Sequence, residues 1–173
     1  ANEIKRIFVG NESAKISIIA FESLTCSYCA KFHQDVYPLL KKEFLDTGLA
    51  KIEFRHFPLD IAAFNASKVA QCTNDGNLEI LESLYANQQK WVKGSSIEEA
   101  NINLQKFLSK EGFNIDFESC INNKQIEDFV LNDRIDGAKN FKVNATPTII
   151  INNKKFEKTL NYKNLKKALE KLI

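Results

Sequence analysis

Two cysteines separated by two residues are the side chains of this sequence best suited to chemistry. Cys26 and Cys29 follow an apolar run at residues 16–21 and lead into apolar positions spaced by threes and fours. This spacing predicts a helix with Cys29 on the stripe that faces the core and Cys26 at its exposed beginning. Because one thiol can be attacked from solvent while the other waits beneath it, the pair is typical of a thiol–disulfide exchange site.

The beginning of a helix would activate Cys26. The thiolate is the nucleophile, and a free cysteine with a pKa of about 8.5 is mostly protonated near neutrality. Unpaired N–H groups and the positive end of the macrodipole favour a negative sulfur at a helix N-terminus. A lowered pKa also makes Cys26 a good leaving group, so its disulfide with Cys29 would be oxidising. We expect substrate thiolates to attack Cys26, and Cys29 to resolve mixed disulfides in the reverse direction.

A fixed disulfide or half of a zinc site would use the same spacing. A structural zinc normally takes four ligands, often from two such pairs. The chain has no second pair of this spacing, and its two histidines are His33 and His56. A two-residue spacing also strains a static bridge. We therefore expect redox chemistry, with no metal and no cofactor.

A second signal is Thr146-Pro147, directly before a β-branched run at residues 148–151. A proline at the start of a strand is tolerated without any function. In a redox site, a cis-proline would turn the chain toward the sulfurs and expose the backbone of Thr146 to an extended substrate. Together with the cysteine pair, Thr146 and Pro147 are predicted to form the other half of the site.

The elements that position these residues lie at the two ends of the chain. Strands are expected at residues 3–9, 16–21 and 52–56, with a helix after Cys26 that Pro38 should kink. A strand, a helix and a strand in succession predict a right-handed unit with parallel strands. The chain then shows only helical periods until about residue 142, followed by a strand, an Asn152-Asn153 turn, a returning strand and an amphipathic helix.

The order β-β-α-β, helical block, β-β-α predicts an α/β fold with an all-helical insertion. We expect residues 1–59 and 143–173 to form one domain and residues 60–142 to form the insertion. Composition is that of an ordinary globular protein, with 44% apolar and 27% charged residues. A net charge of +2 favours neither nucleic acid nor a membrane surface, and no apolar stretch approaches the ~20 residues of a membrane helix.

The removal of a signal peptide or a tag before Ala1 would explain the absence of Met. Four cysteines, an even number, suit an oxidising compartment. Both features lead us to expect an exported protein.

Three segments together resemble the DsbA-type thiol–disulfide oxidoreductases of the thioredoxin-fold superfamily. They are residues 23–30 with Phe32-His33, residues 54–60, and residues 145–148. The resemblance covers nearly the whole chain and includes the helical insertion. It implies a thioredoxin fold, with Cys26 as nucleophile, Cys29 as resolving thiol and Pro147 as the cis-proline. It also implies location in a bacterial periplasm, reduced exported proteins as substrates and a DsbB-type membrane reoxidase. Within the family, the chain is similar in kind to alphaproteobacterial DsbA proteins that carry a second disulfide.

Two departures from the resemblance concern redox tuning. Strongly oxidising members carry Pro-His between the cysteines, whereas this chain carries Ser27-Tyr28. Losing the histidine removes a donor to the thiolate, so we predict a potential between about −120 mV, the DsbA figure, and about −270 mV, the thioredoxin figure. Many relatives also carry a buried acid six residues before the first cysteine; that position is Ala20 here, and Glu22 is a candidate substitute.

Cys72 and Cys120 fall in the helical block and form a third departure. In an oxidising compartment we expect them to form a structural disulfide, whose long loop would contribute roughly 4 kcal/mol. Two buried free thiols, or a pair too distant to bond, are the alternatives. Neither cysteine has the spacing or the helix terminus that activates Cys26, so no catalytic role is expected.

The leading hypothesis is an oxidase that introduces disulfides into exported proteins. An isomerase or reductase on the same fold is the nearest alternative, and a redox-inactive binding protein or chaperone is the alternative from another class. Isomerases usually need a dimer to hold misfolded substrates, and no dimerisation domain precedes residue 3. We therefore expect a monomer and net oxidation.

Overall fold

The computed structural model describes residues 3–173, which build one mixed sheet with helices on both faces. The five strands are β1 (Ile7–Gly10), β2 (Ile16–Glu22), β3 (Ala50–His56), β4 (Thr148–Ile151) and β5 (Lys154–Lys155). Their order across the sheet is β1-β3-β2-β4-β5. β2 and β3 pair in parallel, and every other neighbouring pair is antiparallel. The predicted strand–helix–strand unit is confirmed.

The helix after Cys26 is a continuous run of four segments. They are α1 (Ser27–Lys31), the π-helical η1 (Phe32–Val36), α2 (Tyr37–Leu40) and the π-helical η2 (Lys41–Leu45). Pro38 has no N–H to donate, and the turn just before it is widened, so that the Tyr37 N–H donates to the Phe32 carbonyl five residues back. The sequence predicted a kink at Pro38; in the structure, π-helical turns precede and follow the short α2 segment that contains the proline.

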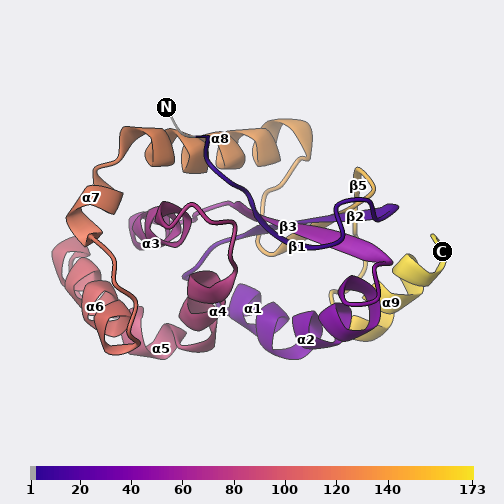
Figure 1. Ribbon diagram of the computed structural model, residues 1–173, viewed down its shortest axis with the longest axis horizontal. Helices are drawn as coiled ribbons and strands as arrows, with labels where there is room; N and C mark the ends of the chain where they lie inside the picture. The colour runs from indigo at the N-terminus through magenta and orange to yellow at the C-terminus, as the bar shows by residue number, and fades with distance from the viewer. Residues whose placement is uncertain (1–2) are drawn as a thin grey trace.

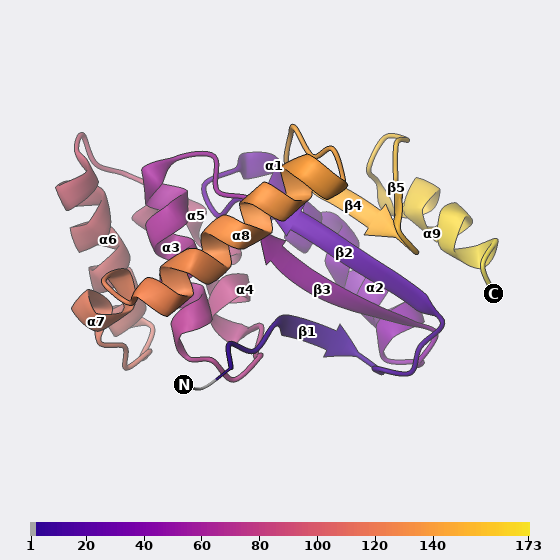
Figure 2. The same ribbon diagram turned by 90° about the horizontal axis from the view of Figure 1, so that it is seen from above.

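The sheet lies between two helical layers (Figure 1). One face is covered by the helix after Cys26 and by α9 (Tyr162–Glu170), and the other by α8 (Lys124–Asn140), which crosses the strands in Figure 2. Since side chains alternate along a strand, Ile18 and Ala20 join the larger core, while Ile19 and Phe21 join a smaller core on the opposite face. The central strand β2 is thus buried on both faces.

Close contact between α8 and β2 depends on a glycine. A Cβ placed at Gly137 would lie 2.8 Å from the Phe21 ring, which is itself fully buried. The missing side chain lets the α8 backbone approach the sheet directly over Phe21. This contact holds β2, the strand that leads to Cys26.

The helical insertion lies between β3 and β4. Its helices are α3 (Ile61–Cys72), α4 (Glu79–Ala86), α5 (Gln88–Trp91), α6 (Ile97–Lys110), α7 (Phe117–Ile121) and α8. The predicted α/β fold with a helical insertion is confirmed. The division of the chain at residues 60 and 142 into two domains stays a prediction.

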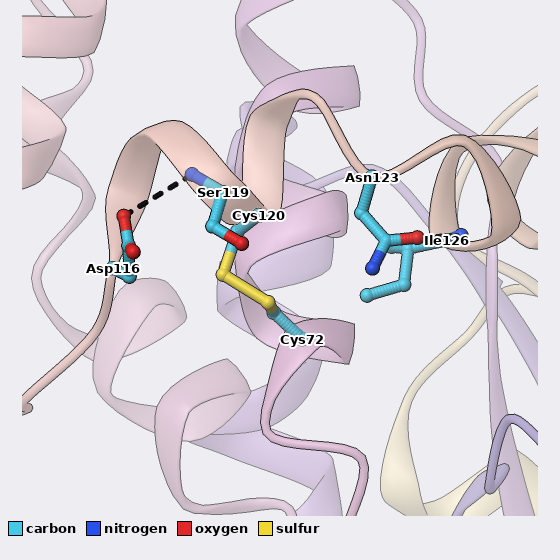
Figure 3. Close-up of a disulfide and its surroundings, with 6 residues drawn as sticks. All are labelled: Cys72, Asp116, Ser119, Cys120, Asn123 and Ile126. Carbon is cyan, nitrogen blue, oxygen red and sulfur yellow. Dashed lines mark hydrogen bonds between the residues drawn. A yellow bond between two sulfur atoms is a disulfide. The ribbon is translucent and has the colours of Figure 1, made fainter. Parts of the chain in front are cut away.

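A disulfide joins Cys72, the last residue of α3, to Cys120 in α7 (Figure 3). Their Cα atoms are 5.6 Å apart. On either side of this bridge, Asp116 caps α7 and Asn123 caps α8 through side-chain oxygens that accept backbone N–H bonds. The bridge and the caps together fix the short helix α7 against α3. Across residues 3–173, the helices all fall short of the length and apolar character needed to span a bilayer.

Candidate active site

Cys26 occupies the N-cap position of α1, directly after the turn that ends β2. Its N–H donates to the Ser23 carbonyl over 3.0 Å, which closes the turn, and its backbone is extended (φ −79°, ψ 121°) before the helix begins. The sulfur is half-buried and free, as is that of Cys29. The central strand therefore delivers the cysteine to the helix N-terminus that the sequence predicts.

Several donors stabilise a negative charge on the Cys26 sulfur. The largest effect comes from the Cys29 thiol, which donates to it; the Thr146 side chain and the N–H groups of Cys29 and Tyr28 add to this. Together they outweigh partial burial and lower the pKa of Cys26 to about 5. At neutral pH Cys26 is a thiolate.

Cys29 lies one turn later and is 0% exposed. The Ser23 N–H donates to its sulfur over 3.5 Å. Burial raises the pKa of Cys29 far above its ordinary value, and its hydrogen bond to Cys26 and the nearby Glu22 carboxylate add to the effect. The two sulfurs thus differ in both exposure and charge, since Cys26 is accessible and ionised while Cys29 is enclosed and protonated.

Thr146 and Pro147 lie beside Cys26, although 120 residues separate them in the sequence. Cys26 Sγ lies 3.6 Å from the Thr146 carbonyl oxygen, to which it donates only when protonated, and the Thr146–Pro147 peptide bond is cis. Thr146 Oγ1 is buried and has no partner among the side chains and backbone groups of residues 3–173. This hydroxyl is free to donate to the Cys26 thiolate, which agrees with its lowering of the Cys26 pKa.

A buried charge network lies next to the two cysteines. His33, on η1, places Nε2 2.8 Å from Glu22 Oε2 at the end of β2, and its Nδ1 contacts Glu82 Oε1 on α4. A neutral imidazole carries one N–H, so a ring that donates to two carboxylates is an imidazolium. Burial disfavours this charge, but Glu22 and Glu82 outweigh it and raise the pKa of His33 to about 9. Burial also raises the pKa of Glu22, against the opposing effect of His33.

His33 and Glu22 could be singled out from the sequence, whereas Glu82 could not. Glu82 belongs to the insertion, 49 residues after His33, and nothing in its local pattern indicates a partner in the first helix. Tyr85, one turn further along α4, stacks on the His33 ring with centroids 4.3 Å apart. His56 lies outside this network and is hydrogen-bonded to Gln71 in the interior.

Two cavities flank the helix that carries the cysteines. One, of about 600 Å³, is mainly apolar and is lined by Tyr28, Phe32, Val36, Pro147, Leu160 and Tyr162 among others. The other, of about 610 Å³, is lined by Ser27, Ala30 and Gln34 on one side and by residues 85–90 on the other. Tyr28 is 72% exposed and stands at the apolar cavity, while Ser27 faces the second. A thiolate beside an apolar groove can receive a cysteine presented by another polypeptide.

The profile of the family described as "Thioredoxin" matches residues 2–171 of this chain. The chain belongs to the thioredoxin family. Its strand order and helical insertion are those of the thioredoxin fold in its DsbA-type form, and the expected fold class is confirmed. The resemblance to DsbA-type proteins is likewise confirmed, because a curated disulfide bond formation protein and a DsbA structure are similar to this chain over almost its full length.

Among curated relatives, disulfide bond formation protein D of Bacillus subtilis is 26% identical, with 94% of this chain and 75% of that protein covered. A Rickettsia typhi protein named as a protein-disulfide oxidoreductase is 25% identical over 95% of this chain and 61% of its own length. The chain spans between 52% and 61% of the length of three curated Rickettsia relatives that it matches.

Among solved structures, Wolbachia pipientis alpha-DsbA1 superposes with a TM-score of 0.86 at 26% identity, covering 99% of this chain and 92% of that one. BdbD from Bacillus subtilis superposes with a TM-score of 0.77 at 22% identity, covering 96% of this chain and 91% of that one. The chain is therefore a DsbA-type member of the thioredoxin family.

Proposed function

We propose that this protein is a dithiol oxidase that introduces disulfides into exported proteins by exchange at Cys26–Cys29. The observation that carries the proposal is the inequality of the two sulfurs. Cys26 is half-buried, faces donor groups of Cys29, Tyr28 and Thr146, and has its pKa lowered to about 5, whereas Cys29 is enclosed. Stabilising the Cys26 thiolate stabilises the reduced enzyme, which makes its disulfide an oxidant.

The cycle follows from these roles. In the oxidised enzyme, a substrate thiolate attacks Cys26 Sγ, a substrate–Cys26 disulfide forms, and Cys29 leaves and takes up a proton. A second substrate thiolate then attacks the substrate sulfur of the mixed disulfide, and Cys26 leaves as its stable thiolate. The substrate loses two electrons and gains a disulfide, while the enzyme is left with Cys26 and Cys29 reduced. A DsbB-type membrane reoxidase would accept these electrons and restore the bridge.

The Cys26–Cys29 disulfide is proposed to be a weaker oxidant than that of DsbA and a stronger one than that of thioredoxin. The pKa of Cys26 is lowered to about 5, between about 3.5 for DsbA and about 7 for thioredoxin. Ser27 and Tyr28 contribute no imidazole donor to the thiolate, in line with this ordering. Ser27 and Tyr28 therefore act as the redox-tuning dipeptide, with a potential between those of thioredoxin and DsbA.

Export to an oxidising compartment such as the periplasm, after removal of a signal peptide, is part of the same proposal. Disulfides persist in such compartments, and a second one joins Cys72 to Cys120. The Bacillus subtilis relative is named for disulfide bond formation. The apolar groove beside Thr146 and Tyr28 would take reduced, unfolded segments of exported substrates, and the protein would act as a monomer.

The deciding experiment is the reduction potential of Cys26–Cys29 in a glutathione titration, with Cys72–Cys120 left intact. We expect a potential above about −180 mV, the value for protein disulfide isomerase. A value near that of thioredoxin would contradict the oxidase and favour a reductase. Cys29→Ser should accumulate mixed disulfides with reduced substrate when started from the Cys26 mixed disulfide with glutathione, and normal turnover by this variant would contradict the assigned roles.

A further inference from the structure

One side chain of the helical insertion hydrogen-bonds to two carbonyls of the catalytic loop, the turn at residues 23–26 that ends at Cys26. Gln88 Nε2 donates to the Leu24 carbonyl over 2.7 Å and to the Cys26 carbonyl over 2.9 Å. A primary amide nitrogen carries two hydrogens, so each carbonyl receives one. Gln88 is the first residue of α5 and lies 62 positions after Cys26, and the proposed exchange cycle does not use it.

The short helix α5 that carries Gln88 is held in place by hydrogen bonds to α4. Trp91, at the other end of α5, is 2% exposed, and its Nε1–H donates to the Leu84 carbonyl over 2.8 Å. The Asn87 side chain donates to the Ser83 carbonyl over 2.8 Å. These bonds fix α5 to the end of α4, so the Gln88 amide has little freedom to follow a moving loop.

The carbonyls that Gln88 holds belong to the peptide groups around Cys26. The Cys26 carbonyl also accepts from the Ala30 N–H over 3.2 Å, the first hydrogen bond of the helix, while the Cys26 N–H donates to Ser23. The sulfur and the carbonyl branch from the same Cα. Holding the carbonyl therefore holds the sulfur in line with the N–H groups of Tyr28 and Cys29 that open the helix.

We propose that Gln88 is a positioning residue, through which the helical insertion holds the Cys26 backbone where its thiolate meets the helix N-terminus. The proposal rests on the proposed function, because it concerns the same thiolate. Gln88 does not touch the sulfur; it acts through the Leu24 and Cys26 carbonyls. Its amide also offsets the negative ends of two carbonyl dipoles close to a negative sulfur.

Other groups that interact electrostatically with Cys26 are Cys29 on α1, Glu22 on β2 and Tyr85 on α4. The test leaves all of them in place. It compares Gln88→Met, which keeps an unbranched chain and removes the donor, with Gln88→Glu, which keeps the shape and turns an acceptor toward the two carbonyls. Gln89→Met is the matched control, because Gln89 is the exposed neighbour and makes no hydrogen bond to the catalytic loop.

The experiment measures the thiolate absorbance of the reduced full chain against pH, together with the glutathione equilibrium constant and the thermal unfolding of the oxidised form. In Gln88→Met we expect the Cys26 midpoint to rise by about half to one pH unit, and the glutathione equilibrium constant to shift about three- to tenfold toward the disulfide form. Gln88→Glu should raise the midpoint further, and Gln89→Met should reproduce the wild type.

A Gln88→Met variant that unfolds at lower temperature but keeps the wild-type midpoint and equilibrium constant would overturn the proposal, because Gln88 would then only support the fold. Equal shifts in Gln88→Met and Gln89→Met would overturn it too, since the effect would not depend on the two hydrogen bonds. If Gln88→Met does not fold, Gln88→Glu decides by the same readouts. A wild-type midpoint near 8.5, the ordinary value, would instead contradict the proposed function itself.

Discussion

His33 Nε2 lies 2.8 Å from a carboxylate oxygen of Glu22, and each side chain is 3% exposed. The pair joins the end of β2 to the helix that carries both cysteines, and Glu82 extends it to the insertion. A charge removed from water is tolerated when it is paired and hydrogen-bonded. Glu22 and His33 are therefore tolerated in the interior as a pair, and the partly exposed Glu82 is a second acidic partner of His33.

Replacing His33 by Leu should lower the free energy of unfolding of the reduced protein by roughly 3–5 kcal/mol, because Glu22 would remain buried without its cation. Urea unfolding followed by circular dichroism measures the change. The matched variant is Glu22→Gln/His33→Leu, which removes both charges and should recover part of the loss. Losses that simply add in the double variant would show that the two residues are not coupled.

The contribution of His33 to stability should depend on pH. Its pKa is raised to about 9 in the folded protein, from about 6.5 in an unfolded chain. The folded state thus binds the proton more tightly, so the stabilisation is complete below about pH 6.5 and is lost as the pH rises through 9. The difference in unfolding free energy between wild type and His33→Leu should shrink across this window, and a difference that grows with pH would contradict the imidazolium assignment.

Alkylation of the reduced protein by iodoacetamide should separate the two cysteines. We expect the rate at Cys26 to reach half its plateau at a pH of about 5, following the lowered pKa, while enclosed Cys29 stays unmodified. Peptide mass analysis identifies the labelled residue, and Cys26→Ser should abolish the rapid phase. A rate that rises only above pH 8 would mean that the thiolate is not stabilised.

Thr146→Val should raise the pKa of Cys26, because it removes the unpartnered hydroxyl while keeping a similar volume. One lost hydrogen bond to a charged sulfur corresponds to about one pH unit, so alkylation at pH 5 should slow by about three- to tenfold. Thr146→Ser retains the hydroxyl and should behave as wild type. Equal alkylation rates in the Val and Ser variants would show that the Thr146 hydroxyl does not affect the pKa of Cys26.

Cys72→Ala/Cys120→Ala should lower the free energy of unfolding by about 2–5 kcal/mol, because the bridge no longer restricts the unfolded chain. The alkylation profile of Cys26 should stay the same, since α3 and α7 hold the disulfide within the insertion. Denaturant unfolding and alkylation of the same variant test both statements. A shifted Cys26 profile would show that the bridge influences the active site.

The sequence by itself was sufficient for features determined by neighbouring residues. The apolar run of β2, the helical spacing after Cys26 and the β-branched run of β4 predicted the elements that the structure contains. Side-chain alternation and periodicity report burial locally, so they also placed Cys29 inside and Cys26 at the helix N-terminus. The helix geometry around Pro38 was less predictable, because a helix can accommodate the missing N–H of a proline either by a kink or by π-helical turns.

Contacts between distant segments were decided by the tertiary structure. The sequence placed Thr146 beside Cys26 only on the assumption that the cysteine pair forms a redox site with a cis-proline, and it gave no sign that Glu82 contacts His33 or that Gln88 contacts Cys26. Glu82 and Gln88 sit on short helices of the insertion, where a polar side chain looks like any solvated one. Whether such a side chain contacts a buried imidazolium or a loop carbonyl depends on how α4 and α5 pack against the first helix. That packing depends on many side chains that are far apart in the sequence.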